Sequence, residues 1–141
     1  MDAAVQFDHV HFAYDRTPVL EDVTFAVAPG EFFGLIGPNA AGKSTLLKLV
    51  LGLLAPQRGQ VLVLGQEAHA ARRRIGYVPQ FPTFARNFPI DVLHMVLQGR
   101  LGLGAAAGRY STDDHAATRR ALRAVEIESL ANTPIRELSG G

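Results

Sequence analysis

One short segment, residues 37–44, restricts the fold of this chain more than any other part of the sequence. It reads GPNAAGKS and lies between the apolar run EFFGLIG and a leucine-rich run that begins after Lys43. Its pattern is a glycine, any four residues, and then Gly-Lys followed by Ser or Thr. Such a segment binds phosphate when a strand precedes it and a helix follows it. The sequence therefore predicts a strand, a phosphate-binding loop and a helix in that order.

The residue types in this segment suit the chemistry of a phosphate. Backbone N–H groups of residues 39–44 can surround the phosphate oxygens, and a helix beginning near Lys43 adds the positive end of its dipole. Lys43 carries a full charge for the β- and γ-phosphates, and the Ser44 hydroxyl can bind Mg²⁺. Thr45 offers a further hydroxyl to the α-phosphate. The predicted nucleotide-binding residues are Gly37, Pro38, Asn39, Ala40, Ala41, Gly42, Lys43, Ser44 and Thr45. A plain glycine turn with an incidental lysine is the alternative.

Hydrophobic patterns predict the elements around this loop. Alternation of apolar and polar side chains indicates half-buried strands at residues 5–14 and 20–28, the second ending in a Pro29-Gly30 turn. The apolar run 31–37 does not alternate, which is typical of a strand covered on both faces. Residues 59–65 read as another extended segment. From Lys43 the spacing becomes helical, with one broad apolar side made by Leu46, Leu47, Leu49, Val50 and Leu53.

Beyond residue 90 the pattern becomes helical. Residues 90–100 and 113–127 are both helix-like, and Ser111 with Asp114 fits a capping box that opens the second helix. The first part of the chain is therefore expected to be α/β, and the later part mostly helical.

The composition limits the classes of function. The 141 residues are 48% hydrophobic and 19% charged, as in a globular protein. The net charge of +1 argues against a nucleic-acid partner bound by phosphate neutralisation. The absence of cysteine excludes disulfides and thiolate zinc sites. The N-terminus has no apolar export signal, and the longest apolar run, LLKLVLGLLA, is about half of a membrane span.

Four segments, taken together and in this order, resemble the nucleotide-binding domains of ABC transporters over essentially the whole chain. FAY places Tyr14 where that family has an aromatic ring that stacks on adenine, and GPNAAGKST corresponds to its Walker A loop. IGYVPQ places Gln80 at the Q-loop position, and LSGG is the start of the family signature. The resemblance implies a P-loop NTPase fold with N-terminal antiparallel strands, the start of a RecA-like core and an α-helical subdomain. We expect an ATP-binding α/β part at residues 1–88 and a helical part at residues 89–141.

The resemblance also implies roles and partners. Gln80 would contact Mg²⁺ and the attacking water. In this family the signature residues Ser139, Gly140 and Gly141 contact the γ-phosphate held by a second nucleotide-binding subunit, so that two subunits sandwich two ATP molecules head to tail. The expected partners are ATP, Mg²⁺, that second subunit and integral membrane permease subunits, with no nucleic acid. The expected location is cytoplasmic, peripheral on the inner face of the cytoplasmic membrane.

Two departures from the family pattern stand out. Ala40 replaces the usual glycine, which costs on the order of 1 kcal/mol if that backbone position needs a positive φ. In addition, no Asp or Glu here matches the Walker B acid or the catalytic base that follow the signature in the family, and the switch histidine is not found. We therefore interpret the chain as an N-terminal fragment of an ATPase subunit, which binds Mg-ATP weakly and has negligible turnover by itself.

The transported cargo is the least constrained inference. Residues 72–102 resemble the matching segment of zinc and manganese importers, and iron–siderophore and cobalamin importers share part of it. A soluble ABC-family ATPase acting on ribosomes or chromosomes and a non-catalytic nucleotide-binding fragment are the alternatives.

A few other residues suggest sites, but surface roles account for them better. His9 and His11 lie on one strand face with no third metal ligand nearby in the sequence, so we interpret them as solvated. We interpret the charged run Arg72–Arg74 as part of a solvent-exposed surface. His94 is expected to pack near a membrane subunit rather than to act in catalysis.

Overall fold

The computed structural model describes residues 3–80, 88–101 and 109–138. The chain divides into two compact units, Met1–Val78 and Pro79–Gly141, which are described separately. The boundary expected from the sequence, between residues 88 and 89, stays a prediction. In the described part of the chain, no helix has the length and apolar character needed to cross a bilayer.

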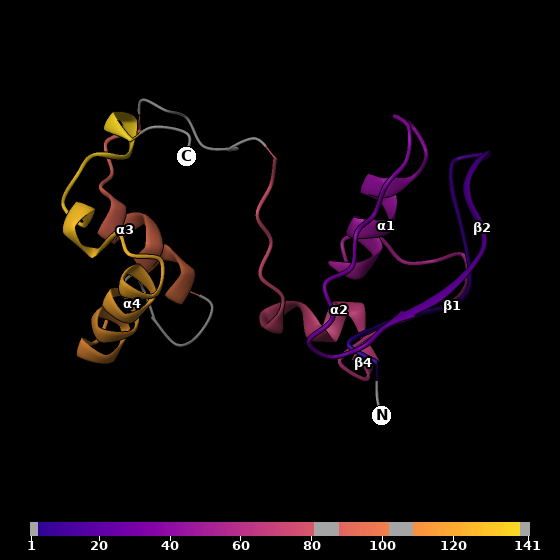
Figure 1. The fold of residues 1–141 in the computed structure, drawn as a ribbon, viewed down its shortest axis with the longest axis horizontal. Coiled ribbons are helices and arrows are strands. Elements are labelled where there is room, and N and C mark those ends of the chain that lie inside the picture. Colours follow the sequence, from indigo (N-terminus) through magenta and orange to yellow (C-terminus); the bar gives the residue numbers. More distant parts are fainter. Residues whose placement is uncertain (1–2, 81–87, 102–108, 139–141) are drawn as a thin grey trace. The chain divides into compact units, whose positions relative to one another are not determined.

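The first unit contains a four-stranded antiparallel sheet in the order β2-β1-β3-β4. Its strands are β1 (Val5–Tyr14), β2 (Thr17–Val27), β3 (Arg58–Val63) and β4 (Gln66–Glu67). Figure 1 shows β1 and β2 running together as one long hairpin. The strand predicted at residues 5–14 is confirmed, but its alternation is interrupted by a register shift between Phe7 and Val10, so that Phe7 is buried before the shift and Val10 and Phe12 are buried after it. The turn at Pro29-Gly30 is also confirmed, with Gly30 at φ +78°.

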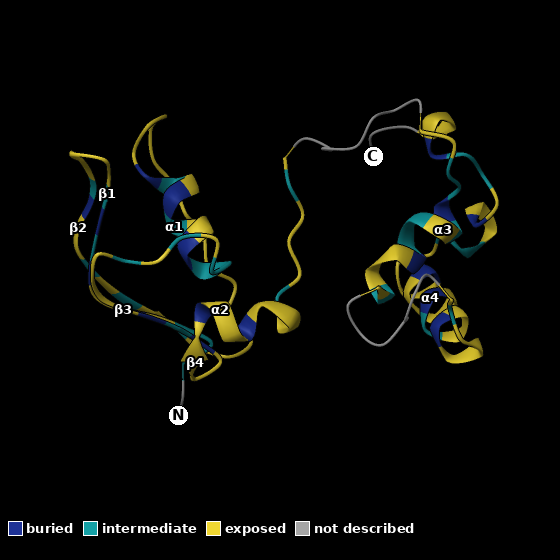
Figure 2. Ribbon diagram, turned by 180° about the vertical axis from the view of Figure 1, so that it is seen from behind, coloured by how far each residue is buried: buried dark blue, intermediate teal, exposed yellow. Residues whose placement is uncertain are grey.

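One helix packs its buried side chains into the core of this sheet. Helix α1 (Lys43–Val50) begins at the predicted residue, and Leu49 is completely buried against a cluster that includes Phe7, Val10 and Val61. The broad apolar side expected from the sequence is narrower, since Leu47 and Leu53 are exposed and Leu53 lies beyond the helix. Figure 2 shows both buried and exposed stretches along α1. A short helix α2 (Ala68–Ala71) and a 3-10 turn η1 (Arg72–Arg74) complete the unit.

The strand predicted at residues 31–37 is wrong. These residues form no strand, and Phe32 and Ile36 are 100% and 95% exposed. A strand covered on both faces needs neighbouring strands to pair with its backbone. The strands of the described sheet pair only with one another, so this run has no strand partner there and is exposed. The ring of Phe33 stacks on that of Phe25, with 5.4 Å between the centroids.

The second unit is helical, as predicted. It contains α3 (Val92–Leu97), the 3-10 turn η2 (Gln98–Arg100), α4 (Thr112–Ala124) and the turns η4 (Glu128–Leu130) and η5 (Ile135–Glu137). Its core cluster brings together Val92, Leu122, Ala131 and Ile135. The predicted capping box of α4 is confirmed: the amide of Asp114 donates to the Ser111 hydroxyl oxygen, and the Ser111 amide donates to the Asp114 carboxylate.

An ion pair reinforces this cap. The Nε of Arg100 donates to the carboxylate of Asp114 over 2.8 Å, which ties η2 to the start of α4. This hydrogen bond, together with the two from Ser111, lowers the pKa of Asp114 to about 2. A charged carboxylate in the first turn also complements the helix dipole.

Candidate nucleotide-binding site

The predicted phosphate-binding loop leads directly into helix α1. Gly42 is the N-cap of this helix at φ +83° and contributes no side-chain cap. Among the described hydrogen bonds, the amides of residues 42–45 donate to no protein acceptor. The first amides of a helix always lack partners within the helix, and they attract anions. The start of α1 therefore has backbone N–H donors available at the position where the sequence predicts a phosphate-binding loop.

Lys43 closes the loop onto itself. Its ammonium group donates to the carbonyl oxygen of Gly37 over 2.7 Å and also to that of Pro38. Two neutral carbonyls are weaker partners for an ammonium group than an anionic phosphate oxygen. The residue is thus held in the loop by contacts that a triphosphate can replace, which fits the charge-neutralising role expected of it.

Ala40 occupies a backbone conformation that favours glycine. Its φ is +66°, in the left-handed region, and the residue is exposed. The sequence predicts a cost at Ala40 only if this position has a positive φ, which it has. Ala40 therefore carries steric strain on the order of 1 kcal/mol. The loop nevertheless keeps its turn, with the Ala41 amide donating to the Pro38 carbonyl over 3.4 Å.

Tyr14 lies beside the first turn of α1. The Thr45 hydroxyl donates to the Tyr14 hydroxyl over 3.5 Å, and the Lys48 ammonium lies 6.0 Å from the centre of the Tyr14 ring. Ser44 is exposed, whereas the Thr45 side chain is buried. The structure thus brings the aromatic ring and the phosphate-binding loop to one helix end, although 31 residues separate Tyr14 from Thr45. The contact of Thr45 with an α-phosphate stays a prediction, as does the stacking of adenine on Tyr14.

The remaining predicted residues lie in the second unit. Gln80 is exposed in a bend. Its contact with Mg²⁺ stays a prediction. Ser139, Gly140 and Gly141 fall outside the described residues, so their role in trans also stays a prediction.

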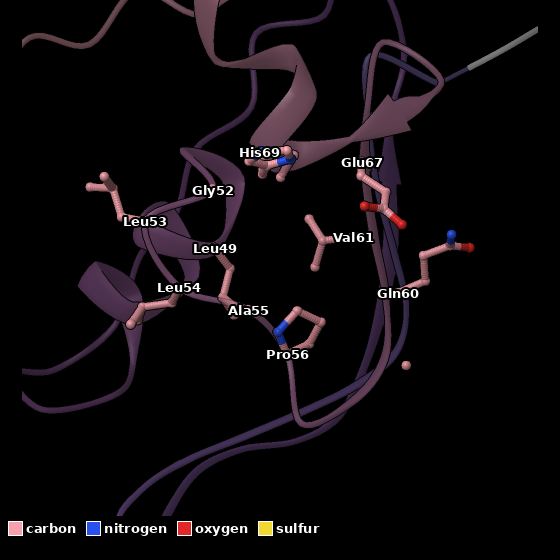
Figure 3. A pocket seen from close by; sticks show the side chains of 12 residues that line it. Leu49, Gly52, Leu53, Leu54, Ala55, Pro56, Gln60, Val61, Glu67 and His69 are labelled. Carbon is pink, nitrogen blue, oxygen red and sulfur yellow. The ribbon is translucent and has the colours of Figure 1, made fainter.

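A cavity of about 590 Å³ lies at the other end of α1. Figure 3 shows Leu49 and Val61 facing one another across it, with Glu67 and His69 at its margin. None of the predicted nucleotide-binding residues lines this cavity. It is therefore separate from the phosphate-binding loop.

Sequence reasoning missed one polar cluster on the sheet. Asp22 on β2 lies 2.6 Å from Nδ1 of His9, and its carboxylate is 3.9 Å from Nε2 of His11. The hydrogen bond that the His9 ring donates to the Asp22 carboxylate raises the pKa of His9. Within the described ranges no group of three or more His, Asp or Glu residues is arranged to hold a metal ion. Only the cross-strand register, which contains bulges here, reveals this pairing.

Comparisons with known proteins agree on one family. The model of the ABC transporter family matches residues 20–141. The zinc uptake ATP-binding protein ZnuC of Bacillus subtilis is 41% identical over 97% of this chain and 60% of its own length. The manganese transport ATP-binding protein MntB of the same organism is 40% identical over 97% of this chain and 55% of its own length. The Nod factor export ATP-binding protein I of Paraburkholderia xenovorans is 38% identical over 99% of this chain and 45% of its own length.

Solved structures show the same fold. The protein cbiO1 of Clostridium perfringens, part of the ABC transporter complex cbiONQ, superposes with a TM-score of 0.82 at 25% identity, over 99% of this chain and 57% of that one. An ATP-binding subunit of an ABC transporter superposes with a TM-score of 0.70 at 30% identity, over 96% of this chain and 56% of that one. The predicted fold class, with its antiparallel strands and helical part, is thereby confirmed. This chain, which spans between about half and 60% of the length of these relatives, belongs to the ABC transporter family.

Proposed function

We propose that this chain is the N-terminal part of the ATP-binding subunit of an importer that uses Mg-ATP to drive a metal ion across the cytoplasmic membrane. The observation that carries the proposal is the start of α1, where backbone amides find no acceptor among the described residues and where the Lys43 ammonium group binds only loop carbonyls within that part of the chain. Such a site favours a multiply charged anion. The relatives named as ATP-binding proteins suggest a nucleoside triphosphate as the source of that anion.

In this proposal the loop binds and orients the triphosphate. Amides of residues 39–44 would surround the β- and γ-phosphates, Lys43 would neutralise them, and Ser44 with Gln80 would hold Mg²⁺. When bound, Mg-ATP would supply the β–γ phosphoanhydride bond whose hydrolysis drives the transporter. The hydrolytic base would come from residues other than these 141, because no Asp or Glu here matches the family position. The chain by itself would then bind Mg-ATP without appreciable turnover.

The proposed assembly is a dimer on a membrane protein. Ser139, Gly140 and Gly141 of each subunit would contact the γ-phosphate bound to the other, so that ATP draws two subunits together head to tail. Permease subunits would convert this closure into transport, and the subunit would sit on the cytoplasmic side of the membrane. The name of cbiO1 as part of a transporter complex supports an assembly of this kind.

The names of the relatives ZnuC and MntB favour a metal ion as the cargo, and the zinc uptake named for ZnuC favours import as the direction. Export is the second candidate, since a relative of 38% identity is named for Nod factor export. A soluble ATPase on ribosomes or chromosomes is a weaker candidate, because the relatives described above carry transport names.

Metal uptake by living cells tests the proposal. A strain lacking the gene is complemented with the full-length protein, with Lys43→Met, or with Arg73→Met as a control that removes an exposed charge away from the loop. We expect the unsubstituted protein and the control to restore accumulation of zinc or manganese, and Lys43→Met to fail. Unchanged metal content after deletion of the gene would contradict metal import, and recovery of the protein with ribosomes instead of membranes would favour the soluble ATPase.

A further inference from the structure

Two side chains of α1 hold the ring of Tyr14. The Thr45 hydroxyl is 3.5 Å from the Tyr14 hydroxyl, and the Lys48 ammonium lies over the ring at 6.0 Å from its centre. Residues three apart on a helix lie on the same face, so both contacts come from one side of α1. The ring of Phe12 adds an edge-to-face contact at 4.9 Å between centroids. Tyr14 is thus supported from its hydroxyl, one face and its strand neighbour.

The two helix contacts differ in their surroundings. The side chain of Thr45 is buried, with the residue only 3% exposed, and the Tyr14 phenol oxygen is a weak hydrogen-bond partner of its hydroxyl at 3.5 Å. Lys48 is exposed in the last turn of α1, and its ammonium is attracted to the electron-rich face of the ring. Tyr14 itself remains 42% exposed, which leaves part of it open to a ligand.

We propose that Lys48 is a positioning residue, which fixes the ring of Tyr14 relative to the phosphate-binding loop at the start of the same helix. A planar base stacks on the face of the ring away from Lys48, while the loop holds the phosphates. The base site and the phosphate site then share one rigid element. This inference rests on the proposed function, because it concerns how the same nucleotide is recognised.

A positioning role makes a specific demand on the energetics. Lys48 should matter only for ligands that carry a base, and only while the Tyr14 ring is present. A general electrostatic role would instead weaken every anionic ligand, whether or not it carries a base. Inorganic tripolyphosphate has the charge of the nucleotide tail without the base, so it separates the two roles.

The test is isothermal titration calorimetry of the full-length protein with Mg-ATP and with Mg-tripolyphosphate. We expect Lys48→Met to weaken ATP about twofold to fivefold, the size of one exposed cation–π contact. Tripolyphosphate affinity should change no more than in the control Arg73→Met. Lys48→Arg should restore ATP affinity, and Lys48→Met should have no effect on ATP when added to Tyr14→Leu.

Other outcomes overturn the inference. Equal weakening of both ligands, full additivity with Tyr14→Leu, or unchanged ATP affinity in Lys48→Met would each show that Lys48 does not act through the ring. Failure of the unsubstituted protein to bind either ligand would contradict the proposed function itself. Binding of both ligands with no effect of Lys48→Met contradicts the positioning role alone.

Discussion

Replacing Ala40 with glycine should stabilise this protein, although glycine usually destabilises. The backbone of Ala40 is in the left-handed region at φ +66°, where the Cβ of an L-residue causes a steric strain of roughly 1–2 kcal/mol. Glycine removes that strain but adds about 0.4–1 kcal/mol of chain entropy to the unfolded state. The residue is exposed, so no buried methyl group is lost. The difference is a net gain in unfolding free energy of about 0–1.6 kcal/mol, or roughly 0.8 kcal/mol at the middle of both ranges.

The neighbouring alanine provides a matched control. Ala41 is exposed and does not have a positive φ, so Ala41→Gly should lower the unfolding free energy by about 0.5–1 kcal/mol. In a thermal unfolding experiment the two variants should shift Tm in opposite directions, by about 4 °C per kcal/mol for a chain of 141 residues. Because Ala40 already has its positive φ without nucleotide, Ala40→Gly should change the Kd for Mg-ATP less than about twofold. Equal destabilisation by both substitutions would refute the reasoning.

Three further predictions follow from the described contacts. Gly59 and Gly65 have similar positive φ angles of +78° and +73°, but a Cβ added at Gly59 would lie 2.2 Å from the His9 carbonyl oxygen, whereas one added at Gly65 would meet no atom within 4 Å. In chemical denaturation, Gly59→Ala should therefore lower the unfolding free energy by about 3 kcal/mol or more and Gly65→Ala by about 1 kcal/mol. Equal losses would contradict this. The buried Thr118 hydroxyl has no partner among the described residues, so Thr118→Val should raise the unfolding free energy by about 1 kcal/mol in urea titrations, and a loss of that size would contradict it. The pKa of Asp114 is about 2 in the folded protein and higher in the unfolded chain, so the ionised carboxylate stabilises the fold above about pH 4 and this stabilisation is lost as the pH falls towards 2. The difference in unfolding free energy between the unsubstituted protein and Asp114→Asn should therefore shrink over that range. A constant difference would contradict this prediction.

Local patterns predicted the elements whose stabilising contacts are local. The Ser111–Asp114 capping box depends on neighbouring residues and is confirmed. The strand at residues 5–14 is confirmed as well, although a register shift between Phe7 and Val10 interrupts the alternation that predicted it. The start of α1 at Lys43 was predictable for the same reason, because the helix follows directly from the loop. Its apolar side was overestimated, since burial of Leu47 and Leu53 depends on which surfaces pack against the helix.

Features that depend on distant residues could not be read from the sequence. The run at residues 31–37 has the composition of a buried strand, but a strand forms only where neighbours pair with it, and here Phe32 and Ile36 are exposed. The pairing of His9 with Asp22 depends on bulges in the β1–β2 register. The contact between Tyr14 and Thr45 requires the end of β1 to meet α1, which no pattern within either segment reveals.

The direct test of the central claim is the affinity of the full-length protein for Mg-ATP with and without the Lys43 ammonium group. Isothermal titration calorimetry compares the unsubstituted protein with Lys43→Met, which keeps most of the side-chain length, and with Lys43→Arg, which keeps the charge. If the start of α1 and Lys43 bind the triphosphate, Lys43→Met should weaken Mg-ATP at least about tenfold, because a charge-assisted contact contributes roughly 1.5–3 kcal/mol. Lys43→Arg should retain part of the affinity. Equal affinity of the unsubstituted protein and Lys43→Met for Mg-ATP would contradict the account.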